Sequence, residues 1–489
     1  MKETKPHHSR RIVVIGGGIS GLAATHALVE RGAAAESAPR VLLLEQSARL
    51  GGVISTRQRD GFLLEGGPDS FISEKPEAVR LANRIGLADR LIETTEAHRR
   101  SFIVRDGRLR PVPEGFQLLA PSRLWPFITT GIFSWRGKAR MALDLVLPRR
   151  AAAANGDEEE SLAQFVRRRL GREALERMAQ PMVGGIYTAD PERLSLRATM
   201  PRFLEMERTH RSLIRAMMKR RGHESAAGAR GTSGARYSLF LSLDEGMRTL
   251  VERIGALLPQ ESVRLNTTVE SLAFDRERAE WKIRVGAPGE TIRADAVCLA
   301  LPAYTAARLL RATDAELAAD MESIPYASTA TINLAWKRAD IAHPLDGFGF
   351  VVPFVERRSV LACTFSHVKF KGRAPEGYAL LRAFVGGALQ PDMFELDEDE
   401  MTARVVADLR ALLGIEKPPL FAHVEKWPRS MAQYHLGHLA TVERIRRRAR
   451  TLPGLHLAGN AYDGAGIPDC IRSGETAADS ILASEYGVE

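Results

Sequence analysis

The chain has 489 residues, 45% of them hydrophobic and 26% charged. This composition is typical of a folded protein of two or three domains and excludes one that is mainly disordered. The three cysteines, Cys298, Cys363 and Cys470, lie far apart, which argues against a disulfide scaffold, a zinc ribbon or an iron–sulfur cluster, and we expect no metal. The net charge of +9 permits contact with polyanions, but no recognition motif accompanies it, so we expect no nucleic-acid partner.

The N-terminal ten residues are polar and lack the apolar core of a secretory signal. No stretch reaches the roughly 18 apolar residues that a membrane span needs. We therefore expect a cytoplasmic protein, with peripheral contact to the cytoplasmic face of the membrane as an alternative.

The first element in chain order is a β-branched run over residues 11–15, which predicts a buried strand. A glycine turn and a helix follow, and residues 41–44 form a second strand that ends at Glu45. Glycines spaced as Gly-x-Gly-x-x-Gly let a backbone approach a pyrophosphate, and the acidic residue can hold a ribose. The residues expected to bind this dinucleotide are Gly16, Gly18, Ile19, Ser20, Gly21, Glu45 and Gln46.

The middle of the chain begins with aromatic residues and cations alternating over 118–147, which suits either a membrane-interface surface or a helical cap. The basic, small-residue segment 215–236 is expected to be a mobile loop. The remaining pattern predicts strands near residues 263–272, 281–285, 296–301, 329–336, 347–353, 360–365, 379–385 and 455–460, and helices near 161–166, 397–413 and 469–483.

Three further motifs distinguish this chain from a nicotinamide dehydrogenase. They are Arg49-Leu50-Gly51-Gly52, Glu65-Gly66-Gly67-Pro68-Asp69, and the late glycines from Gly459 to Gly466. Together they resemble the flavoprotein amine-oxidase superfamily. Residues 107–113, 183–191, 384–387 and 464–470 narrow the resemblance, over about residues 11–485, to the protoporphyrinogen oxidase family, which also includes oxidases of coproporphyrinogen.

The resemblance implies FAD as cofactor. It adds these cofactor-binding residues: Arg49, Gly51, Gly52, Gly67, Pro68, Asp69, Val269, Trp427, Gly459, Ile467 and Pro468. It also implies these substrate-binding residues: Arg100, Gly184, Val351, Thr364 and Phe384. Arg99 is the alternative to Arg100 as the partner of a propionate, because a guanidinium suits a bidentate carboxylate contact. Thr364 stands where a leucine is expected and Pro68 where some members have asparagine, and no general base is named.

The predicted fold is α/β, with a discontinuous Rossmann-type FAD domain, a mixed-sheet substrate domain and a helical insert. The expected boundaries are 1–95, 244–302 and 425–489 for the FAD domain, 205–243 and 303–424 for the substrate domain, and 96–204 for the helical domain. A homodimer and hand-over of product to ferrochelatase follow from the resemblance alone.

The implied reaction is the oxidation of protoporphyrinogen IX to protoporphyrin IX in haem biosynthesis, with dioxygen as acceptor and hydrogen peroxide as by-product. Coproporphyrinogen III is the first alternative substrate, and another FAD-dependent oxidase or desaturase is the second. A binding module on the same fold, without flavin, is the alternative of a different class.

Overall fold

The computed structural model describes residues 9–33, 37–117, 119–150, 159–226, 240–286 and 289–484. A five-stranded parallel sheet has the order β12-β2-β1-β16-β22. Its strands are β1 (Arg11–Ile15), β2 (Arg40–Leu44), β12 (Val263–Arg264), β16 (Ala296–Leu299) and β22 (Leu455–Leu457). These strands come from the beginning, middle and end of the chain, so this part of the fold is discontinuous, as predicted.

Both faces of the parallel sheet are covered, which explains why its strands are apolar at successive positions. Ile12 and Val14 belong to one buried cluster, while Val13 and Ile15 belong to another. The first cluster includes α1 (Ile19–Gly32), α11 (Arg248–Leu257) and α18 (Ile467–Ala483). The second includes α12 (Ala303–Leu310), α13 (Ala315–Glu322), α17 (His438–Ala449) and an antiparallel sheet of β13 (Val269–Asp275), β14 (Glu280–Val285) and β15 (Glu290–Ala294).

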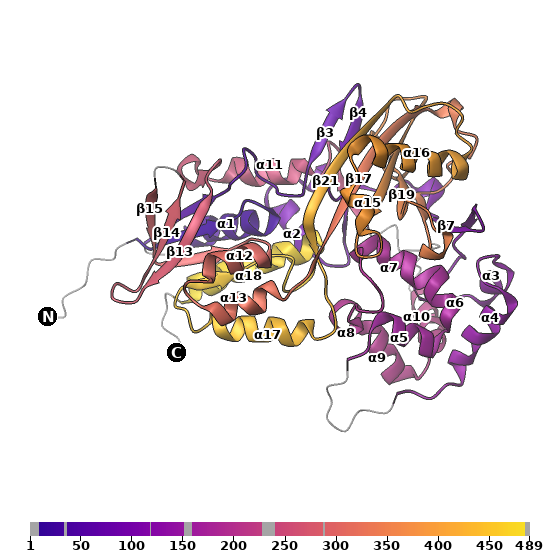
Figure 1. Cartoon of the computed structure of the whole chain (residues 1–489), viewed down its shortest axis with the longest axis horizontal. Coiled ribbons are helices and arrows are strands. Elements are labelled where there is room, and N and C mark those ends of the chain that lie inside the picture. The colour runs from indigo at the N-terminus through magenta and orange to yellow at the C-terminus, as the bar shows by residue number, and fades with distance from the viewer. Residues whose placement is uncertain are drawn as a thin grey trace.

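Two twelve-residue strands, β17 (Tyr326–Lys337) and β21 (Phe421–Ala432), begin a seven-stranded mixed sheet (Figure 1). The sheet continues through β20 (Tyr378–Gly386), β19 (Ala362–Phe365), β18 (Gly349–Val351), β7 (Phe102–Arg105) and β8 (Arg108–Pro111). One of its faces packs on α16 (Glu398–Leu413), whose N-cap is Asp397. The opposite face carries three of the predicted substrate-binding residues, Val351, Thr364 and Phe384.

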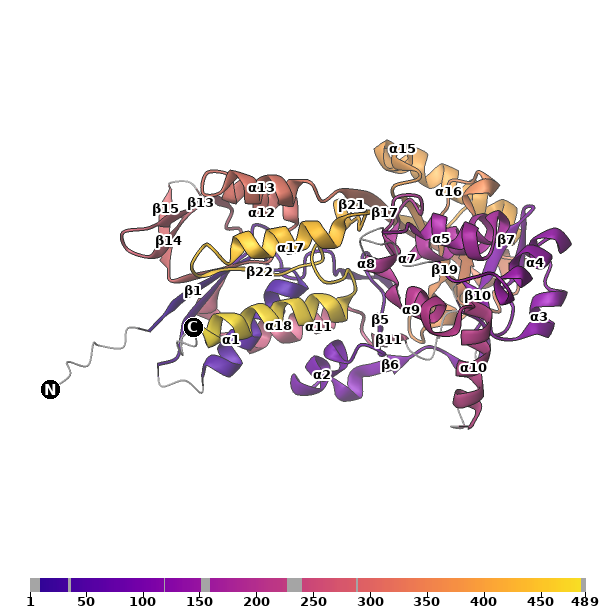
Figure 2. The same ribbon diagram turned by 90° about the horizontal axis from the view of Figure 1, so that it is seen from below.

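The helical region comprises α3 (Leu124–Thr129), α4 (Trp135–Ala142), α5 (Leu162–Arg169), α6 (Arg172–Ala174), α7 (Gln180–Tyr187), α8 (Leu196–Thr199), α9 (Pro201–His210) and α10 (Leu213–Ala226). Figure 2 shows it at the end of the molecule away from the parallel sheet. The prediction of a loop over 215–236 is wrong up to Ala226, because buried Leu213, Ile214 and Met217 give α10 an apolar side. Residues 227–239 lie outside the described part of the chain.

Smaller elements join these layers. They are the hairpin β3 (Thr56–Arg59) and β4 (Phe62–Glu65), the sheet β5 (Phe71–Ile72), β11 (Phe240–Leu243) and β6 (Leu91–Glu93), the pair β9 (Phe116–Gln117) and β10 (Ala120–Pro121), and the helices α2 (Glu77–Arg84), α14 (Ser366–Lys369) and α15 (Pro391–Glu395).

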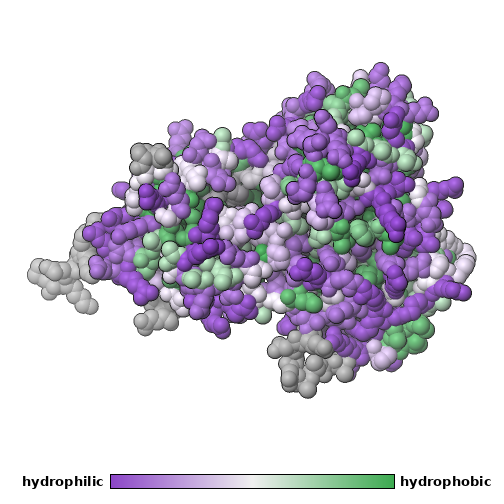
Figure 3. Space-filling model, viewed as in Figure 1, coloured by the Kyte–Doolittle hydropathy of each residue, from purple (hydrophilic) through white to green (hydrophobic). Residues whose placement is uncertain are grey.

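The surface of the helical region carries exposed apolar side chains. Trp125 on α3 is 74% exposed and Trp135 on α4 is 72% exposed, and Lys138 lies over the Trp135 ring. Figure 3 shows hydrophobic residues gathered at the lower right of the molecule, where this region lies. In the part of the chain that the structure describes, no helix is both long enough and apolar enough to cross a membrane.

Candidate active site

The glycine turn between β1 and α1 has two kinds of glycine. Gly16 has a φ of +105°, and a Cβ on Gly21 would lie 1.9 Å from the carbonyl oxygen of Gly16, so both are required by the backbone itself. A Cβ on Gly18 would meet no atom of the described residues within 4 Å. Gly18 is also the N-cap of α1 and provides no side-chain cap, so no N-cap side chain satisfies the first N–H groups of the helix. This geometry suits an anionic group.

A second loop lies against the first. The amide of Gly51 donates to the carbonyl of Gly17 at 2.8 Å, and the Arg49 guanidinium donates to the carbonyls of Gly52 and Ile54. Glu45 accepts from the amides of Gly17 and Ser47 at 2.6 and 2.8 Å. Glu45 therefore fastens the two loops together, a role that the spacing alone did not show.

The Gly66–Asp69 turn is held from both sides. A Cβ on Gly67 would lie 1.7 Å from the carbonyl oxygen of Val53, directly after the second loop. On the other side, the Trp427 indole and the Thr331 hydroxyl donate to the carbonyl of Gly66 at 2.8 and 2.7 Å. Trp427 therefore contacts this turn rather than only filling the core. Pro68 is half-buried within the turn.

The C-terminal segment closes the same edge. Helix α18 begins at Ile467 with Pro468 in its first turn, and a Cβ on its Gly474 would lie 2.2 Å from the carbonyl oxygen of Ser20. The helices α1 and α18 therefore cross in close contact, as Figure 2 shows. Both follow parallel strands, so both N-termini lie at the carboxyl edge of the sheet.

The other predicted cofactor residues lie around this edge. Gly459 follows β22 and donates its amide to Ser473 of α18 at 3.1 Å. Val269 begins β13 two residues after Thr267, whose amide donates to the carbonyl of Glu45. Ile19 and Ser20 open α1, and Gln46 is exposed beside Glu45.

Three of the predicted substrate residues share one face of the mixed sheet. Directly paired residues in adjacent strands point to the same side, and residues two apart in one strand do so as well. Val351 pairs with Ala362, which pairs with Phe384, and Thr364 pairs with Arg382. This face also reaches the Gly66–Asp69 turn, because Arg382 donates to the carbonyl of Gly67.

Helix α7 brings the predicted Gly184 to this region. A Cβ on the adjacent Gly185 would lie 3.8 Å from Cγ1 of Val351, and Gln180 accepts a hydrogen bond from the amide of Phe354. The helix follows a single π-helical turn over Leu175–Ala179, a feature that often marks functional segments.

Arg100 is not grouped with these residues. Its Nε donates to the carbonyl of Asp346 at 2.6 Å, its guanidinium pairs with the Asp346 carboxylate, and it lies 5.5 Å from the Phe102 ring. That ring belongs to the apolar cluster on the α16 side of the sheet. Arg99 instead donates to Glu93 and to the carbonyl of Thr94.

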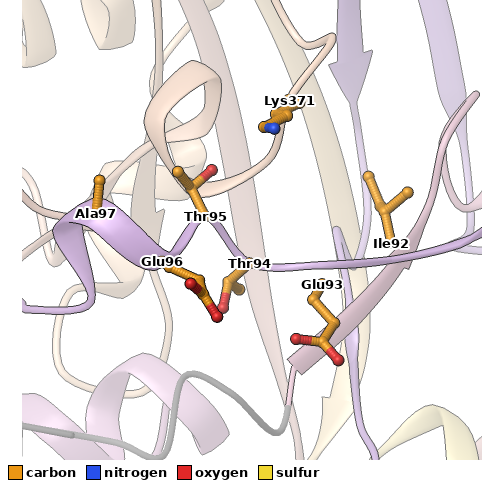
Figure 4. Close-up of a pocket in the computed structure, with 7 residues that line it drawn as sticks. All are labelled: Ile92, Glu93, Thr94, Thr95, Glu96, Ala97 and Lys371. Atoms are coloured by element: carbon orange, nitrogen blue, oxygen red, sulfur yellow. The ribbon is translucent and has the colours of Figure 1, made fainter.

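A cavity of about 550 Å³ is lined in part by Glu93 and Thr94, the two residues to which Arg99 donates. Figure 4 shows Lys371 facing it from one side, whereas the carboxylates of Glu93 and Glu96 point away from Lys371. The backbone joins the cavity to the turn, because the Thr95 amide donates to the carbonyl of Lys369 at 3.0 Å. The lining residues are Ile92, Glu93, Thr94, Thr95, Glu96, Ala97 and Lys371.

The structure adds two residues that the sequence analysis missed. Lys369 of α14 donates to both carboxylate oxygens of Asp69 at 2.9 Å, and Arg382 lies 3.8 Å from the same carboxylate. Burial opposes ionisation of Asp69, but the two cations outweigh it and hold the pKa of Asp69 below its usual value. A sequence signal existed for Arg382, since it is the one charged residue in the apolar run Tyr378–Gly386.

The carboxyl edge of the parallel sheet carries two helix N-termini and three glycine turns, an arrangement that defines a dinucleotide-binding protein. The adjacent face of the mixed sheet can bring a second molecule to the dinucleotide. The open space at Gly18 and the exposed Val53 fit a bound flavin nucleotide. Comparison with known proteins agrees. Residues 19–482 match the family described as flavin-containing amine oxidoreductase.

Two bacterial relatives are similar over nearly their whole length. One from Bacillus subtilis is 34% identical over 99% of both chains, and one from Propionibacterium freudenreichii is 36% identical over 96% of this chain and 90% of its own; both are named coproporphyrinogen III oxidase. A plant relative, protoporphyrinogen oxidase 2 of Arabidopsis thaliana, is 25% identical over 97% of this chain and 94% of its own.

Solved structures give the same result. The crystal structure of a candidate protoporphyrinogen oxidase from Exiguobacterium superposes with a TM-score of 0.85 at 30% identity, over 98% of this chain and 99% of that one. Cyclohexylamine oxidase from Brevibacterium oxydans, at 17% identity and a TM-score of 0.70 over 98% and 100% of the two chains, shares the fold. The chain therefore belongs to the flavin-containing amine oxidoreductases and, within them, to the protoporphyrinogen and coproporphyrinogen oxidase family. The predicted amine-oxidase-like α/β fold is confirmed.

Proposed function

We propose that this protein oxidises coproporphyrinogen III to coproporphyrin III, with FAD as cofactor and dioxygen as acceptor. The observation that carries this proposal is the naming of its relatives: three that are 30–36% identical over 96–99% of the chain are coproporphyrinogen III oxidases. The plant protoporphyrinogen oxidases are 25–28% identical. This order reverses the sequence-based preference for protoporphyrinogen IX.

The cofactor's part is to accept two electrons and a proton at a time and to pass them to dioxygen. The chain's part is to hold it. Gly18 and the first amides of α1 would bind the pyrophosphate, Glu45 would bind a ribose hydroxyl, and the N-terminus of α18 would face the flavin.

The sheet face would hold the porphyrinogen. Val351 and Phe384 present apolar surface to a flat ring, and the glycines of α7 let that ring approach closely. Thr364 adds a hydroxyl where a leucine is expected, so this part of the face is more polar than predicted. Coproporphyrinogen carries four propionates. Lys371 lines the cavity and Arg99 contacts its lining residues Glu93 and Thr94, so both offer cations for carboxylates, whereas Arg100 is paired with Asp346.

A parallel assay tests the proposal. The purified yellow protein is given coproporphyrinogen III and protoporphyrinogen IX in air, and porphyrin fluorescence is recorded with autoxidation subtracted. We expect a larger kcat/KM for coproporphyrinogen III. A preference for protoporphyrinogen IX would reverse the substrate assignment, and no turnover of either by a flavin-loaded protein would favour another FAD-dependent oxidase. A colourless protein that cannot be loaded with FAD would favour a binding module.

The exposed tryptophans of the helical region support a second, separate proposal of peripheral membrane contact. Tryptophan beside lysine or arginine is typical of surfaces that lie in the lipid interface. Flotation with vesicles that contain anionic lipid tests it: the protein should float, and Trp125→Ser with Trp135→Ser should not. The homodimer and the hand-over to ferrochelatase stay predictions.

A further inference from the structure

Arg382 is a buried cation with an unused donor. It lies at the centre of an apolar strand and is 3% exposed. One of its terminal nitrogens donates to the carbonyl of Gly67, but its Nε has no hydrogen-bond partner among the described residues. A buried donor left unsatisfied costs about 1–3 kcal/mol, so such a group needs an explanation.

The charges around Arg382 do not cancel. Asp69, Lys369 and Arg382 form what we call the turn cluster, and it contains two cations and one carboxylate. Glu65, the next acidic group, accepts bonds from the Thr56 hydroxyl and the Met247 amide and interacts with a further buried cation, Arg373, so counting this second pair leaves the excess of one positive charge unchanged. The turn cluster therefore holds an excess positive charge where little water can screen it.

The position of the turn cluster is also specific. The Gly66–Asp69 turn lies between the glycine loops, which it contacts at Val53, and the sheet face that carries Phe384. The reacting part of a dinucleotide bound at the loops would have to meet a substrate on that face. With both bound, the excess charge would lie beside the place where electrons are transferred.

We propose that the turn cluster is a fixed positive charge that stabilises the negative charge gained by the bound flavin when it accepts a hydride, and so raises the flavin's reduction potential. This inference rests on the cofactor of the proposed function and is independent of which porphyrinogen is the substrate. A preorganised charge in a dry site acts without rearrangement when charge develops nearby. Arg382 and Lys369 are positioning residues rather than catalytic residues, because their contacts are with Gly67 and Asp69 of the turn.

Sulfite provides a probe that needs no substrate. It adds reversibly to oxidised flavins and leaves a negative charge on the ring, so its dissociation constant reports the local electrostatic field. Lys369→Met should weaken sulfite binding at least tenfold, and Asp69→Asn should strengthen it at least tenfold. A dye-coupled titration should move the potential in the same two directions, by about 30 mV for each tenfold change in the two-electron equilibrium.

The two variants are expected to change sulfite affinity in opposite directions, which distinguishes an electrostatic effect from a disrupted flavin site. A loosened site would shift both variants in one direction, and that result would overturn the proposal. Lys426→Met is the matched control. Lys426 lies on β21 between Glu425 and Trp427, which are on the side of the turn, but its own ammonium group donates to the carbonyl of Leu396. Its sulfite affinity should be unchanged.

Arg382→Lys and Arg382→Met extend the test. The lysine variant should keep most of the sulfite affinity, whereas the methionine variant should behave like Lys369→Met. If Arg382→Met does not fold, the paired Lys369 and Asp69 variants still decide the matter. Flavin content and the absorbance spectrum of each variant are recorded first, so that loss of the cofactor is distinguished from a changed potential.

Discussion

Two buried ionic clusters, one in the helical region and one at the candidate site, use similar side chains in different ways. In the helical region, Arg169 is fully buried and donates to the carboxylate of Asp144 and to the carbonyls of Asp144, Pro148 and Arg211. The helical cluster contains three arginines and three carboxylates, namely Arg150, Arg168, Arg169, Asp144, Glu160 and Glu207.

The turn cluster is incomplete by comparison. The Nε of Arg382 has no hydrogen-bond partner among the residues that the structure describes, and the two cations of the cluster face one carboxylate, that of Asp69. A cluster that serves the fold needs balanced charge and satisfied donors, because any excess costs stability. A cluster that serves a reaction can keep an excess, since the bound cofactor or substrate completes it. The difference indicates which buried charges to test for function.

The largest expected effect lies in the helical cluster. Arg169→Met leaves the carboxylate of Asp144 buried without its cationic partner and should lower the free energy of unfolding by about 3–5 kcal/mol. Urea denaturation of the flavin-loaded protein measures it. The control is Arg172→Met, because Arg172 is exposed and should contribute little. Equal stability of Arg169→Met and the parent would break the comparison.

The next largest effect concerns two glycines of the loop between β1 and α1, of which Gly21 is required by the fold and Gly18 by the bound cofactor. Gly21→Ala would press a methyl group against the Gly16 carbonyl and should cost about 2–3 kcal/mol of stability together with loss of flavin. Gly18→Ala should fold normally, since the φ of −69° at Gly18 suits any residue and no described atom lies within 4 Å of the added Cβ, yet it should retain less flavin. Melting temperature and flavin absorbance separate the two outcomes. Full flavin content in Gly18→Ala would show that the cofactor does not approach there.

A pH-dependent effect comes from His438, another buried group, whose Nε2 has no hydrogen-bond partner in the part of the chain that the structure describes. Burial lowers the pKa of His438 from 6.5 to about 4. The unfolded chain binds this proton between pH 6.5 and 4 while the folded chain does not, so stability falls as the pH is lowered through that window, by about 2 kcal/mol at pH 5.

The measurement for His438 is a pair of melting temperatures at pH 7 and pH 5. His438→Phe keeps the ring stacked on Tyr434 and should lose less stability than the parent on acidification. Exposed His98→Gln is the control and should follow the parent. If the melting temperature of His438→Phe falls between pH 7 and pH 5 by as much as that of the parent, other groups cause the acid sensitivity.

The smallest effect concerns substrate binding. Arg100→Ala should raise KM for coproporphyrinogen about tenfold with flavin content intact, because a charged hydrogen bond is worth about 1.5–3 kcal/mol and its pairing with Asp346 already uses part of that. Asp346→Asn should lower KM by freeing Arg100. If Arg100→Ala is normal and Arg99→Ala raises KM instead, the propionate contact moves to the residue beside the cavity.

The parts that could be predicted from the sequence are those with local signals. The glycine spacing between residues 16 and 21 predicts strand, turn and helix because backbone geometry requires it there. Val351, Thr364 and Phe384 could be grouped only through a resemblance, since strand pairing over long distances brings them to one face. Lys369 has no local signal at all, because its partner Asp69 is 300 residues away. Arg100 shows the reverse problem, since its neighbour Asp346 could not be foreseen.

The order of the parallel sheet has a consequence for synthesis of the protein. The outermost strand β22 and the helix α18 come from the last forty residues of the chain. Even so, α18 packs on α1, and the two helices together form the nucleotide site at the carboxyl ends of the strands. A ribosome adds about 5–20 residues per second, so roughly 25–100 s pass between the first glycine turn and the helix that closes over it. During that interval the nascent chain has the part of the nucleotide site formed by α1 but lacks the part formed by α18. A premature stop within α18 would therefore release a protein that does not bind flavin and stays colourless.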